Sequence, residues 1–170
     1  MNKRKKKPRK KIKEIFLASD HAGFELKEKI KDYLGEKYNP DEIIINDFGA
    51  LEYDKKDDYP DFIEPMLEEM NKKRQSIGIV FGGSGQGEAI CANKIKGIRA
   101  ALYYGGSTKI VDLSRKHNDA NVLSLGARFV KDKEAKKAVD IFLKTGFDEG
   151  RHLRRIRKIK RIERVERRKE

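Results

Sequence analysis

The chain has 170 residues, 41% charged and 37% hydrophobic, with a formal net charge of +13, which leaves room for one domain of about 100–200 residues. No apolar run approaches the roughly 18 residues that span a membrane, and the run at 15–18 is too short for the core of a signal peptide. The single cysteine excludes an internal disulfide and no Cys/His cluster has zinc spacing, so we expect a cytoplasmic protein without a structural metal.

The first segment, residues 1–13, carries nine Lys or Arg and no acid. It has too little apolar content to order itself, and we expect a disordered basic arm. Contact with RNA or anionic lipid and a simple solubilising role both fit such an arm. The last segment, residues 151–170, carries eleven Lys or Arg with three Glu, which leaves residues 14–150 with a net charge of −4.

Residues 14–150 alternate short apolar runs with stretches of helical spacing. The apolar runs predict strands at 14–19, 43–48, 77–81, 98–104 and 121–125. The helical spacing predicts helices at 24–34, 60–70, 88–94, 108–116 and 133–144, the second opened by Pro60. This alternation predicts an α/β fold, a three-layer αβα sandwich around a doubly wound, Rossmann-like sheet of five parallel strands. Ligands bind such sheets at the carboxyl ends of the strands.

Residues 151–170 lack Gly and Pro and predict an extended C-terminal helix that belongs to the same domain. Its apolar residues fall at every third position from Leu153 to Val165. At about 100° per residue this row winds around the helix, which suits wrapping over a neighbouring subunit.

Two candidate sites follow predicted strands. Asp20 and His21 supply a carboxylate and an imidazole, which handle hydroxyl protons or bind an anion, although Asp20 also fits a helix cap. The stretch 82–87 holds four glycines before a helix, a cradle of backbone N–H groups for a phosphate or an oxyanion. Glu88 follows it, either as a general base or as a capping-box partner of Ser84.

Further candidates lie later in the chain. His117 is a possible proton shuttle, although a lone histidine is more often structural. Arg151 and Arg155 are four residues apart on one helical face, which suits a phosphate or, as the alternative, a solvated basic helix.

Together these motifs resemble those of the type B ribose-5-phosphate isomerases, a family that includes the subunits of galactose-6-phosphate isomerase. The matching motifs, in chain order, are 20–23 (DHAG), 82–88 (GGSGQGE), 92–94 (ANK), 97–99 (GIR), 117–121 (HNDAN) and 150–152 (GRH). The resemblance extends over about residues 14–165 and leaves out the basic arm.

The resemblance implies an aldose–ketose isomerase of the non-oxidative pentose phosphate pathway. Ribose 5-phosphate opens its ring, loses its C2 proton to give a cis-enediolate, and regains a proton at C1 as ribulose 5-phosphate. No metal and no cofactor are implied. The subunits are expected to form a homodimer or homotetramer with shared active sites.

The resemblance also implies roles for individual residues. Asp20, His21 and His117 bind the substrate and open the ring, with His117 as proton donor. The cradle that holds the enediolate consists of Gly83, Ser84, Gly85, Gln86 and Gly87. The remaining substrate contacts are Tyr59 at the sugar, Asn118, and Arg128, Arg151 and Arg155, the arginines chiefly at the phosphate.

One branch of the family uses a cysteine base at the start of the glycine loop and the other a glutamate just after it. Gly82 stands at the first position, so Glu88 is the expected base and Cys91 a packing residue. The helix N-terminus lowers the pKa of Glu88 and burial raises it, and the sequence leaves the balance open.

Two other functions also fit the sequence. A six-carbon sugar phosphate, allose 6-phosphate or galactose 6-phosphate, uses the same chemistry. A nucleic-acid-binding protein would use the basic ends, but it would leave the glycine cradle and Asp20-His21 without a task.

Overall fold

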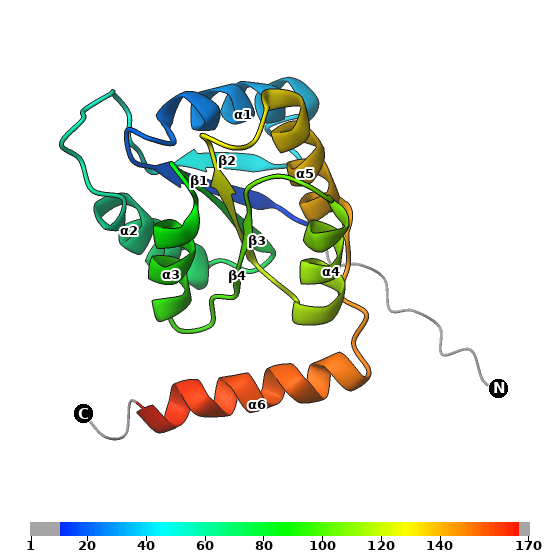
Figure 1. Ribbon diagram of the computed structural model, residues 1–170. Coiled ribbons are helices and arrows are strands. Elements are labelled where there is room, and N and C mark those ends of the chain that lie inside the picture. The colour runs from blue at the N-terminus through cyan, green and yellow to red at the C-terminus, as the bar shows by residue number, and fades with distance from the viewer. Residues whose placement is uncertain (1–10, 167–170) are drawn as a thin grey trace.

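The computed structural model describes residues 11–166 and has the predicted α/β architecture (Figure 1). The strands are β1 (Glu14–Ser19), β2 (Ile44–Asp47), β3 (Ser76–Gly82), β4 (Ala100–Tyr103) and β5 (Val122–Gly126). The helices are α1 (Phe24–Lys37), α2 (Pro60–Lys72), α3 (Gln86–Lys94), α4 (Lys109–Asn118), α5 (Asp132–Lys144) and α6 (Arg151–Glu166). All strand pairs are parallel, in the order β2-β1-β3-β5-β4. The predicted fold class is confirmed.

The central strands β1 and β3 are apolar on both sides because helices cover both faces of the sheet. Helices α1, α4 and α5 pack on one face over a core that contains Leu17, Phe81 and Phe142. Helices α2 and α3 pack on the other face over a core that contains Phe16 and Val80. The alternation of side chains along β1 therefore supplies both cores.

The strand order changes direction between β1 and β3, and this point determines where a ligand fits. From β1 the chain moves outward to β2 and then returns to β3 on the other side. The loops that follow β1 and β3 therefore diverge and leave a crevice at the carboxyl ends of the strands. Gly23 lets the start of α1 approach β3 closely, because a Cβ atom there would lie 2.3 Å from the carbonyl carbon of Phe81.

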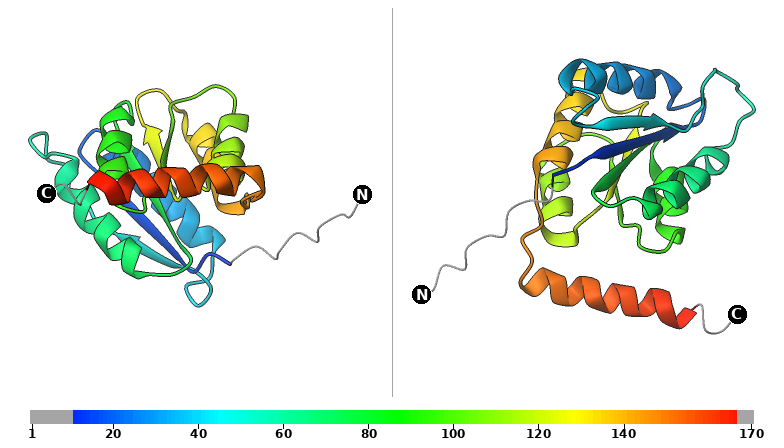
Figure 2. Two further views of the ribbon diagram at one scale, coloured as in Figure 1. Left: turned by 90° about the horizontal axis from the view of Figure 1, so that it is seen from below. Right: turned by 180° about the vertical axis from the view of Figure 1, so that it is seen from behind.

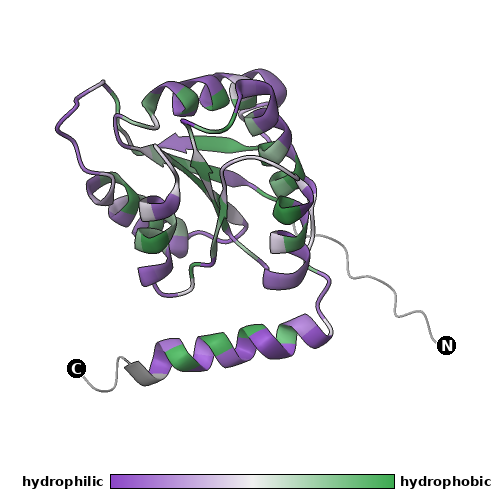
Figure 3. Ribbon diagram, viewed as in Figure 1, coloured by the Kyte–Doolittle hydropathy of each residue, from purple (hydrophilic) through white to green (hydrophobic). Residues whose placement is uncertain are grey.

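Helix α6 lies outside the three layers, along the edge of the body (Figures 1 and 2). Its contact with the body includes the buried residues His152 and Ile156, and the backbone N–H of Gly97 donates to Glu163 Oε1 at 3.4 Å. Ile159 and Ile162, by contrast, are 46% and 55% exposed, and hydrophobic segments recur along the length of the helix in Figure 3. One side of the helix is thus packed and another apolar side is not.

The differences from the sequence-based expectations are confined to ends of elements. The fourth strand begins at Ala100 instead of residue 98, because the backbone N–H of Arg99 donates to the side chain of Asn121 at 2.7 Å. Residues 1–10 and 167–170 lie outside the described residues. Lys13 donates its backbone N–H to Gln75 and Ile12 packs on the core, so three residues of the predicted arm are part of the body. Among residues 11–166, no helix is long and apolar enough to cross a membrane.

Candidate active site

Asp20 is positioned by the turn between β1 and α1. Its Oδ1 accepts hydrogen bonds from the backbone N–H groups of Ala22 at 2.9 Å and Gly23 at 3.2 Å. The side chain thus stabilises the turn that leads into α1, and the residue is 7% exposed. The N-cap of α1 is Gly23, without a side-chain cap, so Asp20 stabilises the turn before the helix and is not the helix cap that the alternative interpretation expected.

His21 is paired with Asp57, which the sequence analysis did not assign to the site. His21 Nδ1 lies 2.6 Å from Asp57 Oδ1, and the same oxygen accepts the backbone N–H of His21 at 2.8 Å. The hydrogen bond to Asp57 raises the pKa of His21, against an opposing effect of burial, and the negative charge of Asp20 adds to the rise. His21 therefore holds its positive charge to a higher pH than a free histidine, next to the cradle expected to bind an anion.

The glycine cradle is held in place by its own carbonyl groups. Gly82 and Gly83 accept backbone hydrogen bonds from Ala127 and Arg128, which follow β5. Gly85 then turns the chain with φ +76° and is the N-cap of α3. Gly85 offers no side-chain acceptor, and the N–H of Gln86, the first residue of α3, makes only a long hydrogen bond to Ser84 Oγ at 3.3 Å, which an anionic ligand can replace.

Glu88 is buried beside this cradle, at 4% exposure. An ideal Cβ atom on Gly82 would lie 1.7 Å from Glu88 Oε1, so the carboxylate fills the space where a side chain at position 82 would stand. Ser84 Oγ accepts from the N–H of Gln86 at 3.3 Å and Ser84 is not the N-cap, which argues against a capping box. Burial raises the pKa of Glu88, and the charge of Asp20 raises it further, against a hydrogen bond from the backbone N–H of Glu88.

Two further predicted residues flank the cradle. A Cβ atom on Gly87 would lie 2.8 Å from the hydroxyl oxygen of Tyr59, and one on Gly83 would lie 3.2 Å from Arg128 Cζ. Together with Asp20, His21 and Glu88 they form what we call the carboxyl-edge group. It combines a buried carboxylate, two cations and a set of N–H donors, which suits proton abstraction from an anionic substrate.

The other predicted residues lie at the opposite edge of the sheet. His117 and Asn118 end α4, which carries the chain back from the carboxyl end of β4 to the start of β5, and Arg151 and Arg155 lie on α6 beyond that edge (Figure 1). We call these four residues the amino-edge group. Within one chain they do not meet the carboxyl-edge group.

The amino-edge group includes a contact that the sequence analysis did not foresee. The rings of His117 and His152 stack at 4.1 Å between centroids, with 5° between their planes. Burial lowers the pKa of His152, and the charges of His117 and Arg151 lower it further. His152, with its pKa lowered, therefore packs flat against the ring of the predicted proton donor.

Three ligand-type side chains also come together in the carboxyl-edge group. Among the described residues, one atom each of Asp20, His21 and Asp57 lie within 4.8 Å of one another. A metal ion here would compete with the proton shared by His21 Nδ1 and Asp57 Oδ1. Metal-free chemistry stays a prediction for this chain.

The His21–Asp57 pair gives a test by titration. Asp57→Asn removes the negative charge, and we expect the pKa of His21, followed by NMR of its ring protons, to fall toward that of an unpaired histidine. Because the native pKa is raised, the pair stabilises the fold at acidic pH and this contribution fades as pH rises through that pKa. Asp57→Asn should thus cost more stability at pH 5 than at pH 9. The exposed neighbour change Asp58→Asn is the control, and an unchanged His21 titration in Asp57→Asn would contradict the assignment.

Comparisons with known proteins identify the family of this chain. The family model described as Ribose/Galactose Isomerase matches residues 15–159. A probable ribose-5-phosphate isomerase B from Mycoplasma genitalium is 44% identical over 142 residues, which cover 83% of this chain and 90% of that protein. The ribose-5-phosphate isomerase B of Mycobacterium tuberculosis is 42% identical over 142 residues, covering 83% of this chain and 84% of that protein.

Solved structures show the same relationship. The crystal structure of the Mycoplasma genitalium ribose-5-phosphate isomerase B with bound ribulose-5-phosphate superposes with a TM-score of 0.81 at 43% identity, covering 89% of this chain and 96% of that chain. The type B ribose 5-phosphate isomerase of Trypanosoma cruzi gives a TM-score of 0.82 at 35% identity, covering 91% of this chain and 99% of that chain. These matches confirm the resemblance read from the motifs and the expectation of an isomerase. The chain belongs to the ribose/galactose isomerase family.

Proposed function

We propose that this protein interconverts D-ribose 5-phosphate and D-ribulose 5-phosphate through a cis-enediolate. The observation that carries the proposal is the buried carboxylate of Glu88, which lies beside the glycine cradle in the space left by Gly82. The relative with ribulose-5-phosphate in its crystal structure supports a five-carbon substrate.

Glu88 takes the C2 proton of the open-chain sugar and returns it to C1. A raised pKa makes its carboxylate a stronger base, because proton affinity and pKa rise together. As the proton leaves, negative charge develops on the substrate oxygens, and the N–H groups of the cradle from Gly83 to Gly87 stabilise it. The transfer is internal to the sugar, so no external electron acceptor is needed.

The remaining residues bind the substrate and open the ring. His117 donates a proton to the ring oxygen and Asp20 orients a hydroxyl, while Tyr59 and Asn118 line the sugar site. Arg128, Arg151, Arg155 and the charged His21 bind the phosphate, where planar guanidinium groups form paired hydrogen bonds. Because a sugar phosphate is charged and stays inside the cell, we place the reaction in the cytoplasm.

We propose that each active site is shared between two subunits of a homodimer, or of a homotetramer built from such dimers. The amino-edge group and the carboxyl-edge group lie at opposite edges of one sheet, so His117 and Glu88 of the same chain are not available to one sugar. A second copy in the reverse orientation supplies the missing half of each site.

The geometry of α6 supports this arrangement. At about 100° per residue, Arg151, Arg155, Ile159 and Ile162 fall within one stripe about 80° wide, which we call the partner stripe. All four residues are exposed. The stripe joins the predicted phosphate ligands to apolar surface that the body leaves uncovered, as expected for a face that docks on another subunit.

The substrate can be tested with a panel of sugar phosphates. We expect kcat/KM for ketose formation to be highest with ribose 5-phosphate and lower with allose 6-phosphate and galactose 6-phosphate. A preference for either six-carbon sugar would overturn the substrate assignment while leaving the isomerase assignment intact.

The role of Glu88 can be tested by substitution. Glu88→Gln keeps the shape but removes the base, and it should lower kcat by about 10²–10⁴ with little change in substrate binding. Cys91→Ser, one helical turn away, is the control and should leave kcat nearly unchanged. An active Glu88→Gln together with an inactive Cys91→Ser would show that the base is misassigned.

A second substitution displaces the Glu88 carboxylate without removing it. Gly82→Ala places a methyl group where Glu88 Oε1 lies, so the flexible carboxylate must move and kcat should fall by about 10²-fold or more. Gly35→Ala adds the same methyl to α1, where nothing lies within 4 Å of it, and should leave activity intact. Wild-type turnover in Gly82→Ala would contradict the placement of Glu88.

The shared site can be tested by mixing inactive variants. Glu88→Gln and the double variant Arg151→Ala/Arg155→Ala should each be nearly inactive alone. After subunit exchange, each mixed dimer contains one site with both defects and one with neither, so it should recover up to about half of wild-type activity. No recovery after verified exchange would place these three residues in the same subunit and defeat the shared site.

A further inference from the structure

Helix α6 has three faces, and only two of them are accounted for. The first faces the body with His152, Ile156 and Glu163. The second is the partner stripe, which lies next to the first on the helix. Between them these faces occupy less than half of the circumference at about 100° per residue.

The third face is mostly basic. It carries six exposed cations, Arg154, Arg157, Lys158, Lys160, Arg161 and Arg164, and the half-buried Leu153 lies within the same arc beside Lys160. They cover an arc of about 160° whose centre is opposite the other two faces. We call this arc the basic face. The acid Glu163 points to the body, and Glu166 falls by helical spacing on the side of the partner stripe.

Among the described residues, the six cations have no counterion. None of them forms an ion pair or hydrogen bond with any residue in the described part of the chain. Some lysines elsewhere are paired, as Lys29 is with Asp132 and Lys116 with Asp112. Six unpaired like charges within 11 residues repel one another and weaken an isolated helix, so the fold itself does not explain them.

The spacing of the arginines suits a chain of phosphates. Arg154, Arg157, Arg161 and Arg164 are three, four and three residues apart, a row with steps of about 4.5–6 Å at 1.5 Å per residue. Guanidinium groups bind phosphate oxygens through paired hydrogen bonds. Seen from below in Figure 2, α6 lies in front of the body, and no described element covers its outer side.

We propose that the basic face of α6 binds the phosphate backbone of a nucleic acid, independently of base sequence. A helix bound at a membrane surface inserts an apolar face between its charged flanks. Of the described apolar side chains of α6, Ile156, Ile159 and Ile162 lie on the body face and the partner stripe, and the half-buried Leu153 alone lies among the cations, which favours a nucleic acid over a lipid surface. This function goes beyond the isomerase, since neither the site nor the subunit contact uses these residues.

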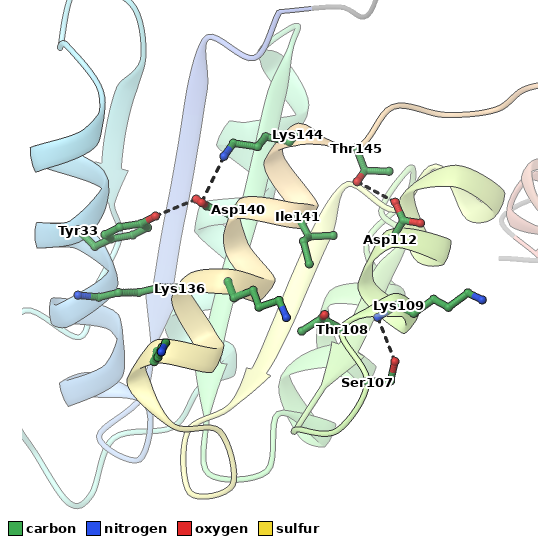
Figure 4. A pocket seen from close by; sticks show the side chains of 12 residues that line it. Tyr33, Ser107, Thr108, Lys109, Asp112, Lys136, Asp140, Ile141, Lys144 and Thr145 are labelled. Atoms are coloured by element: carbon green, nitrogen blue, oxygen red, sulfur yellow. Dashed lines mark hydrogen bonds and ion pairs between the residues drawn. The ribbon is translucent and has the colours of Figure 1, made fainter.

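A second basic surface provides a matched control. A groove of about 810 Å³ is lined by residues of α1, α4 and α5, including Lys109, Lys133 and Lys137 (Figure 4). It also contains the carboxylates of Asp112 and Asp140, which form ion pairs with lysines and would repel a polyanion. Removing lysines there changes the net charge as much as removing arginines from α6.

The test is fluorescence anisotropy with a labelled 20-nucleotide single-stranded RNA and a 20-base-pair DNA duplex between 50 and 200 mM salt, on the full chain. The variant Arg154→Gln/Arg157→Gln/Arg161→Gln/Arg164→Gln should bind RNA at least about tenfold more weakly at the lowest salt. Its slope of log affinity against log salt should be shallower by about 3, at about 0.7 per lost phosphate contact on a single strand. Comparison of the two probes shows whether the basic face prefers the phosphate backbone of single-stranded RNA or that of double-stranded DNA. Gln keeps the helix propensity, which circular dichroism checks.

The control is Lys109→Gln/Lys133→Gln/Lys136→Gln/Lys137→Gln, which removes four lysines that line this groove and should bind within about threefold of wild type. Both variants should keep wild-type isomerase activity, so a failure of this proposal is separate from a failure of the proposed function. Absence of binding by the wild type, or equal losses in the two variants, would overturn the proposal. So would binding to phosphatidylserine vesicles that depends on the four arginines while RNA binding does not.

Discussion

In a parallel sheet all strands end at the same edge, and each connecting helix must return to the opposite edge before the next strand begins. The positions of the candidate functional residues in this protein depend on that constraint. Strands deliver Asp20 and the glycine cradle to the carboxyl edge, whereas α4 must return to the amino edge before β5 begins. A proton donor at the end of α4 is therefore separated by the length of the sheet from a base at the start of α3. In the proposed dimer, the two chains together complete each site.

Burial determines the chemistry within the carboxyl-edge group. Glu88 and Asp20 are both nearly inaccessible and close enough for the charge of one to raise the pKa of the other. His21 is more accessible, and its hydrogen bond to Asp57 raises the pKa of its imidazole. In the crevice, the carboxylate of Glu88 therefore has an increased affinity for a proton, and the imidazole of His21 keeps its positive charge to a higher pH. Burial and neighbouring residues cause both changes.

The sequence predicted the fold and the carboxyl-edge group well because the signals there are local. Apolar runs set the strands, and Glu88 follows the glycines directly in the chain. Asp57 was missed because its partner is 36 residues away and no pattern in the loop before Tyr59 marks the contact. The stacking of His152 on His117 was missed for the same reason, since it depends on how α6 leaves the body. Whether the pKa of Glu88 is raised or lowered depends on how deeply the carboxylate is buried, and only the packed structure shows this.

The overlap between a side chain at position 82 and the Glu88 carboxylate has an evolutionary consequence for the two branches of the family. A chain that gains a cysteine at 82 while keeping the glutamate must fit two groups into one space, and a chain that loses the glutamate while keeping the glycine has neither base. With Glu88 as the proposed base, each single change is therefore expected to impair the enzyme. The two positions form an epistatic pair, and exchange of one base for the other requires both to change together, which keeps the branches apart even where the rest of the fold is interchangeable.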